Sequence, residues 1–176
     1  MDIKKELSEN QTILLVLSGI NYNKEITDVV KKIDDKNIAY ITLNKTNESL
    51  REIFKKAKVN TKNIVFVDAI SKTIKDVPDQ GEGVYYVSSP GALTEMSIVI
   101  SKFIRHNFDY IIFDSLTNLL IYENKIVVSK FFSSLISKLK ESSTKAVFYA
   151  LEVKEQESLI KESGMLVDKV LGLEKR

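Results

Sequence analysis

A glycine and a lysine that follow a long apolar run form the one spacing in this chain that suggests phosphate chemistry. The run Thr12–Gly19 leads into Gly19-Ile20-Asn21-Tyr22-Asn23-Lys24-Glu25. A phosphate-binding loop reads G-x-x-x-x-G-K-[ST]. Its glycines let backbone N–H groups approach the phosphates, its lysine reaches the outer phosphates, and its hydroxyl binds Mg²⁺. Here the loop is one residue short, no second glycine precedes Lys24, and Glu25 replaces the hydroxyl residue. We therefore expect any binding of Mg-ATP to be weak, and no bound cofactor.

The same residues have a simpler interpretation. Ser18 and Gly19 are also typical of a plain turn between a strand and a helix, and this interpretation is favoured. Lys24 would then be a residue of the helix, without a phosphate to bind. Gly81 and Gly83 do not offer a second cradle, because they precede a predicted strand instead of a helix N-terminus.

Composition excludes several kinds of site. The chain has no cysteine and one histidine, His106, so zinc–cysteine sites, thiol chemistry and multi-histidine metal sites are excluded. His106 ends a helical pattern, where a cation suits the helix dipole. The net charge of +2 gives no reason to expect nucleic acid as a partner. We expect a cytoplasmic protein, because no apolar run is long enough to span a membrane and no signal peptide is recognisable.

Apolar periodicity predicts strands and helices in alternation. This order favours an α/β fold with three layers, a mostly parallel sheet and helices on both faces, in one domain over residues 1–176. The region from Ala69 to Gly83 is predicted to be a loop. The strands are expected at Thr12–Ser18, Ile38–Leu43, Asn63–Ala69, Val84–Val87, Asp109–Asp114, Ala146–Leu151 and Val167–Leu173. The helices are expected at Lys24–Asp34, Ser49–Val59, Ala92–Arg105, Asn124–Glu141 and Lys154–Glu162, the last with Gly164 as its C-cap.

The segment Asp109–Ser142, which contains DYIIFDSLT, resembles the Walker B strand and following helix of the KaiC-like and RadA-like branch of the RecA superfamily. NIVFVDAISKTI, AVFYALEV and LVDKVLGLEK are similar to other strands of that core. The resemblance implies a RecA-like P-loop ATPase core, in which Asp114 would hold the water shell of Mg²⁺ beside Ser115. It also implies a catalytic glutamate after the second strand. That place reads Leu43-Asn44-Lys45, without a carboxylate, and Glu48 comes later.

Two roles remain open for Asp114: a ligand of Mg²⁺, or a carboxylate that fixes the turn after its strand. The damaged phosphate loop favours a non-catalytic, degenerate ATPase-fold domain that acts in regulation or signalling by binding a protein. The alternatives are a weak ATP-binding protein that uses Lys24 and Asp114, and a recombination mediator that contacts single-stranded DNA. The residues expected at a vestigial nucleotide site are Ser18, Gly19, Lys24, Asp114 and Ser115. We expect a homo-oligomer or an obligate protein partner, because one of the aromatic residues Phe131, Phe132 and Tyr122 is expected to face a protein contact.

Overall fold

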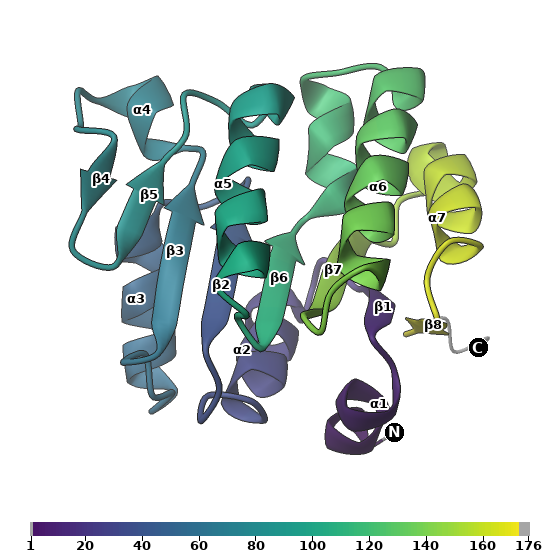
Figure 1. Cartoon of the computed structure of the whole chain (residues 1–176), viewed down its shortest axis with the longest axis horizontal. Coiled ribbons are helices and arrows are strands. Elements are labelled where there is room, and N and C mark those ends of the chain that lie inside the picture. The colour runs from purple at the N-terminus through teal and green to yellow at the C-terminus, as the bar shows by residue number, and fades with distance from the viewer. Residues whose placement is uncertain (1, 173–176) are drawn as a thin grey trace.

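The computed structural model describes residues 2–172, and an eight-stranded sheet forms its centre (Figure 1). The strands are β1 (Thr12–Leu17), β2 (Ile38–Thr42), β3 (Ile64–Asp68), β4 (Gln80–Gly81), β5 (Val84–Tyr86), β6 (Tyr110–Asp114), β7 (Lys145–Leu151) and β8 (Lys169–Leu171). Their order in the sheet is β4-β5-β3-β2-β6-β7-β1-β8. Neighbouring strands are parallel, except that β4 is antiparallel to β5. The carboxyl ends of the parallel strands therefore meet at one edge.

Helices cover both faces of this sheet. In Figure 1, α5, α6 and α7 lie in front of the strands, and α2 and α3 lie behind them. The helices are α1 (Ile3–Glu9), α2 (Tyr22–Lys31), α3 (Asn47–Lys56), α4 (Ser71–Ile74), α5 (Leu93–Arg105), α6 (Lys125–Lys140) and α7 (Glu157–Gly164), with 3-10 turns η1 (Leu116–Ile121) and η2 (Lys154–Gln156). The predicted three-layer α/β class is confirmed.

The alternation of side chains along each strand builds two separate cores. In β1, Leu14 and Val16 belong to the cluster under α5, α6 and α7, whereas Ile13 and Leu15 belong to the cluster under α2 and α3. Because successive residues of a strand point to opposite faces, a strand that is buried on both sides needs an unbroken apolar run. This requirement explains the pattern TILLVL.

Most predicted elements are present, with boundaries shifted by a few residues. The helix after β1 begins at Tyr22, two residues earlier than predicted, so Tyr22 and Lys24 both lie in its first turn. The region from Ala69 to Gly83, predicted to be a loop, contains the short elements α4 and β4. The strand predicted at Val167–Leu173 is Lys169–Leu171, and Leu173 lies outside the described residues.

Two further elements, α1 and η1, were not predicted either. Helix α1 has few apolar positions, and it depends on tertiary contacts: Leu7 is buried, and its carbonyl accepts from Tyr110 Oη at 3.1 Å and from Lys145 Nζ at 3.0 Å. The 3-10 turn η1 lies directly after β6, where Leu116 and Leu119 are buried. Both elements are stabilised by contacts with segments far away in sequence, so the local sequence pattern does not predict them.

The prediction that Gly164 caps a helix is wrong. Gly164 is the last residue of α7, and the cap is Met165 in a right-handed conformation. A Cβ at position 164 would lie 3.0 Å from Val170 Cγ2. A side chain at this position would crowd Val170 of β8. The backbone of Gly164 does not adopt the left-handed conformation that favours glycine.

The adjacent residues Phe131 and Phe132 test the packing of α6. Phe132 is 1% exposed and packs edge to face on Phe148, whereas Phe131 is only partly buried beside Phe113. We expect Phe132→Ala to lower the free energy of unfolding by about 3–5 kcal/mol, because it leaves a cavity in the core. Phe131→Ala should lower it by roughly half as much. Urea denaturation of both variants measures the difference, and equal losses would contradict this packing.

Candidate functional site

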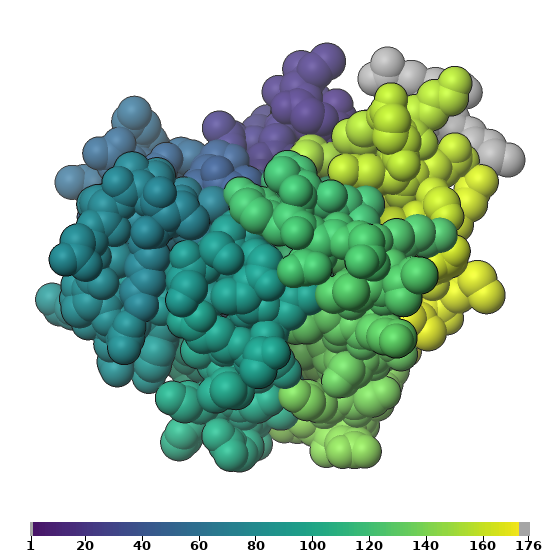
Figure 2. All heavy atoms as spheres, turned by 90° about the horizontal axis from the view of Figure 1, so that it is seen from above, coloured from purple at the N-terminus to yellow at the C-terminus, as the bar shows by residue number. Residues whose placement is uncertain are grey.

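The carboxyl ends of the strands bring together polar residues that lie far apart in the sequence. The register of the sheet places Thr42 directly opposite both Asp68 and Asp114, so these three strand ends form one row across β3, β2 and β6. Figure 2 looks onto this end of the molecule, where segments from the early and late parts of the chain lie beside one another. Ligands of open α/β sheets bind at this edge, which makes it the candidate site.

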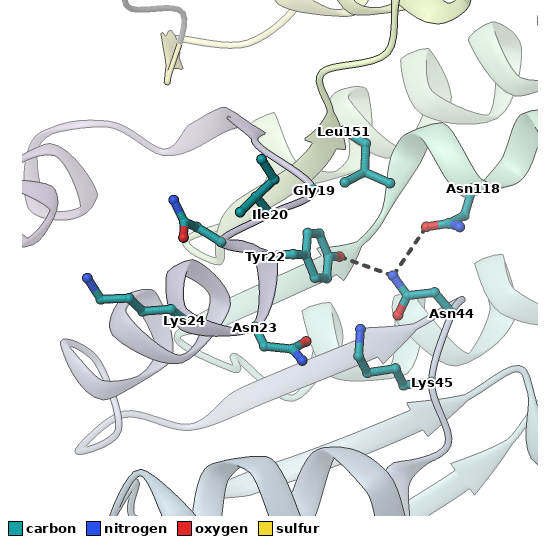
Figure 3. Close-up of a pocket in the computed structure, with 10 residues that line it drawn as sticks. Gly19, Ile20, Tyr22, Asn23, Lys24, Asn44, Lys45, Asn118 and Leu151 are labelled. Atoms are coloured by element: carbon teal, nitrogen blue, oxygen red, sulfur yellow. Dashed lines mark hydrogen bonds between the residues drawn. The ribbon is translucent and has the colours of Figure 1, made fainter.

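A hollow of about 490 Å³ lies at this edge (Figure 3). It is lined by the β1–α2 connection, the first turn of α2, residues that follow β2 and β6, and the last residue of β7. The lining residues are Gly19, Ile20, Asn21, Tyr22, Asn23, Lys24, Asn44, Lys45, Asn118 and Leu151. Among the predicted site residues, Gly19 and Lys24 line the hollow, whereas Ser18, Asp114 and Ser115 do not.

Tyr22 is the residue that shapes this hollow. Its side chain is 8% exposed and reaches across from α2 toward the end of β2, where Asn44 Nδ2 donates to its hydroxyl at 3.1 Å (Figure 3). The Lys45 ammonium lies 4.6 Å from the centre of the Tyr22 ring, a cation–π arrangement. The aromatic ring therefore lies between the β1–α2 connection and the β2 end.

The β1–α2 connection itself is a short turn. Only Ser18, Gly19, Ile20 and Asn21 separate the end of β1 from the start of α2. A Cβ added to Gly19 would have no heavy atom within 4 Å. The position therefore does not require glycine for a close approach of the backbone. Lys24 lies in the first turn of α2, and in Figure 3 its side chain points away from Tyr22 and Asn44.

Asp114 lies in the protein interior. Its side chain is fully buried, and both carboxyl oxygens are used: Tyr40 Oη donates to Oδ2 at 2.5 Å, and Asn44 Nδ2 donates to Oδ1 at 3.1 Å. Burial raises the pKa of Asp114 well above its usual range. The nearby Tyr149 hydroxyl is buried without a hydrogen-bond partner, and burial, followed by the charge of Asp114, raises its pKa as well. This environment favours the neutral form of the Asp114 carboxyl.

Ser115 is part of a local network behind the hollow. Its side chain is fully buried, and its hydroxyl contacts Thr117 Oγ1 at 3.1 Å and donates to Asn118 Oδ1. The Thr117 hydroxyl accepts in turn from the backbone N–H of Leu151 at 3.0 Å. These contacts tie η1 to the end of β7, so the Ser115 hydroxyl is used inside the fold.

Asp68 is a turn-fixing carboxylate, a role that the sequence suggests for Asp114 and not for Asp68. It is fully buried and accepts from the N–H groups of Asn47, Ile70 and Ser71, each at 2.8 Å, and also from the Asn47 amide and the Ser71 hydroxyl. Burial by itself would raise its pKa, but the hydrogen bonds from Ser71 and Asn47 outweigh burial and hold the pKa below the usual value. In the sequence, the position of Asp68 at the end of its strand, after Val67, is the only feature from which this role could be predicted.

Asn44 and Lys45 line the hollow but were not predicted to be site residues. In the sequence they only mark the position at which the catalytic glutamate is missing. Asn44 joins three side chains, because its Nδ2 also donates to Asn118 Oδ1 at 3.3 Å. Lys45 is half-buried, and burial lowers the pKa of its ammonium. Glu48 is exposed and forms an ion pair with Lys75, so its carboxylate interacts outside the hollow.

The described part of the chain holds no cluster of three or more histidine, cysteine or acidic residues that could bind a metal ion. Within residues 2–172, no helix has the length and apolarity that crossing a membrane requires. Neither observation identifies a ligand, so what the hollow binds has to be inferred from the side chains that line it.

Comparison with known proteins identifies the fold. No family model and no curated protein matches the sequence. A solved structure of a KaiC-like protein from the archaeon Pyrococcus horikoshii superposes with a TM-score of 0.61 at 12% identity, covering 91% of this chain and 69% of that one. An ATPase from the type III secretion system of pathogenic bacteria gives 0.55 at 14% identity, covering 93% and 51%. At these identities the likeness shows the fold alone: the chain shares the α/β fold of these two proteins, a mostly parallel sheet with helices on both faces.

The buried carboxyl of Asp114 should affect the pH dependence of stability. Because its pKa is raised in the folded state, the folded protein binds more protons above about pH 4, and stability falls as pH rises toward the folded pKa. Asp114→Asn removes this titration. We expect the variant to lose less stability than the wild type between about pH 4 and 8, by roughly 1.4 kcal/mol for each pH unit between the two pKa values. Urea denaturation across this range measures the slope. Asp28 is an exposed residue of α2, and Asp28→Asn is the control. An Asp114→Asn slope equal to that of the wild type would contradict the burial of a neutral carboxyl.

Asp68 should behave in the opposite way. Its pKa is lowered, so its contribution to stability is present above its usual pKa and is lost as pH falls through the folded value. We expect Asp68→Ala to reduce the free energy of unfolding at neutral pH by on the order of 3 kcal/mol, because buried N–H donors lose their acceptor. The loss should shrink below about pH 4. A loss that is the same at acidic and neutral pH would show that the charge of the carboxylate is not what matters.

Proposed function

We propose that this chain is a non-catalytic domain of the RecA-like ATPase fold, that it uses no Mg-ATP, and that it acts in regulation by binding a protein. The two solved structures described above carry the names KaiC-like protein and type III secretion ATPase, so the fold is one in which ATP chemistry is an obvious candidate. The residues at the candidate site support a different use of the same edge of the sheet.

The position of Tyr22 is the observation that carries this proposal. A phosphate cradle needs successive backbone N–H groups with open space in front of them. Here the connection has four residues, and the Tyr22 ring lies across the strand ends in contact with Asn44 and Lys45. A triphosphate would have to displace this ring and break its hydrogen bond.

The contacts of Asp114 support the same conclusion about Mg²⁺. Magnesium ions prefer ionised carboxylates that keep several water molecules in the coordination shell. The Asp114 carboxyl is fully buried, accepts from Tyr40 and Asn44, and favours its neutral form. Glu25 occupies the place of the hydroxyl that would complete the ion's shell, and it does not line the hollow.

A role in protein binding is supported by the apolar side chains that the surface exposes. Ile20 is 93% exposed in the β1–α2 connection, Met165 is 84% exposed after α7, and Ile121 is 70% exposed at the end of η1. Ile20 and Ile121 both lie in connections that follow strands at the carboxyl edge of the sheet, and exposed large apolar side chains there support an interaction site. Both a second copy of the chain and a different protein would fit this role.

Titration with Mg-ATP tests the proposal. A ligand present at about 100 times its dissociation constant stabilises a protein by roughly 2.7 kcal/mol, which corresponds to a rise in melting temperature of about 5–10 °C for a domain of this size. We expect millimolar Mg-ATP to leave the melting temperature of the wild type unchanged and isothermal calorimetry to record no binding heat.

The variants Lys24→Ala and Asp114→Asn separate the proposal from its alternative. If Mg-ATP stabilises the wild type and both substitutions abolish the effect, the chain is a weak ATP-binding protein and the proposal is overturned. Tyr22→Ala shows whether the ring is the obstacle. Should ATP stabilise this variant alone, the side chain of Tyr22 is what closes the site.

A further inference from the structure

Lys45 has a half-buried ammonium that no carboxylate of residues 2–172 neutralises. Its side chain lies over the Tyr22 ring, and among residues 2–172 it takes part in no ion pair and its Nζ donates no hydrogen bond. Eight other lysines of the described chain do form ion pairs. A cation that is partly removed from water without a partner is costly, which makes it a candidate for binding an anionic group from outside.

The rest of the hollow has the same electrostatic character. Among the residues that the structure describes, its lining contains no carboxylate, and its charged residues are Lys45 on the inner wall and Lys24 at the rim. Four asparagines complete the polar lining, and Asn44 Oδ1 is buried without a hydrogen-bond partner. The hollow therefore combines positive charge with amide groups that donate and accept hydrogen bonds.

Two aliphatic side chains form an apolar rim beside this polar centre. Ile20 and Leu151 line the hollow, and Ile20 is 93% exposed. An exposed apolar rim beside a positive centre is complementary to a chain that carries an acidic side chain next to apolar ones.

We propose that this hollow binds an acidic, partly apolar segment of a partner protein, with an aspartate or glutamate carboxylate against Lys45 and an aliphatic or aromatic side chain against Ile20. The inference rests on the proposed role in protein binding and names the chemistry of the partner. The carboxylate of the segment supplies the counter-charge that Lys45 lacks, and the apolar neighbour covers the exposed rim.

Charge alone would also suit a nucleic acid, but the remaining groups do not. Single-stranded nucleic acid is bound by rows of cations that follow the backbone and by aromatic faces on which bases stack. The one aromatic ring that lines the hollow is Tyr22, which is 8% exposed and has Lys45 over it. The aliphatic rim therefore favours a peptide.

Selection of random dodecapeptides displayed on phage, with the whole chain as bait, tests the proposal. We expect the recovered peptides to be enriched in aspartate or glutamate next to isoleucine, leucine, phenylalanine or tryptophan. An independent selection on Lys45→Glu should lose this enrichment. Recovered peptides without acidic enrichment, or the same enrichment on Lys45→Glu, would overturn the proposal.

Affinities of a recovered peptide, measured by fluorescence anisotropy, locate the contact. We expect Lys45→Gln and Ile20→Ser each to weaken binding by about tenfold or more. The matched controls are Lys62→Gln, at the opposite end of the sheet before β3, and Ile98→Ser, on the outer surface of α5 and 55% exposed. Both controls should bind as the wild type does, and controls that weaken binding equally would place the contact elsewhere.

Competition separates this inference from the proposed function. Millimolar Mg-ATP and a single-stranded oligothymidine are each added to the complex with the peptide. We expect neither to displace it. Displacement by the oligothymidine would assign the hollow to nucleic acid and overturn the peptide assignment. Displacement by Mg-ATP would overturn both proposals, whereas absence of ATP binding together with failure of the peptide selection would overturn the peptide proposal alone.

Discussion

A parallel sheet that is covered by helices on both faces imposes one constraint on everything at its edge. All parallel strands must end on the same side, so their last polar residues are forced into a small volume and must find partners there. In this protein the ends of β3, β2 and β6 lie in register at Asp68, Thr42 and Asp114. How these groups satisfy one another decides what space is left for a ligand.

The two aspartates in this row have pKa values that are shifted in opposite directions. Asp68 is ionised because five donors surround it, and its hydrogen bonds fix the connections to α3 and α4. Asp114 is fully buried and has two neutral donors, so burial dominates its pKa. The number of donors, and not the type of residue or its place at a strand end, separates a structural carboxylate from a neutral one.

Asn44 links the buried row to the surface. Its amide donates to the buried Asp114 and to the Tyr22 hydroxyl, so the ring of Tyr22 is held across the strand ends by the same group that contacts the carboxyl below. Lys45, next in sequence, covers that ring and brings a positive charge to the hollow. This edge of the sheet thereby presents a surface of lysine, amide and aliphatic side chains.

The amino-acid sequence by itself determined the fold class and most of the elements, because apolar periodicity reports directly on which faces are buried. The sequence also showed that the β1–α2 connection is short and that it lacks the second glycine and the hydroxyl residue of a phosphate-binding loop. It could not distinguish Asp68 from Asp114, because their donors come from residues such as Tyr40 and Asn47, which only the register of the sheet brings close. It missed α1, whose stability depends on Tyr110 and Lys145. The hollow around Lys45 was likewise decided by tertiary structure, because burial and the absence of a counter-charge are properties of neighbours in space.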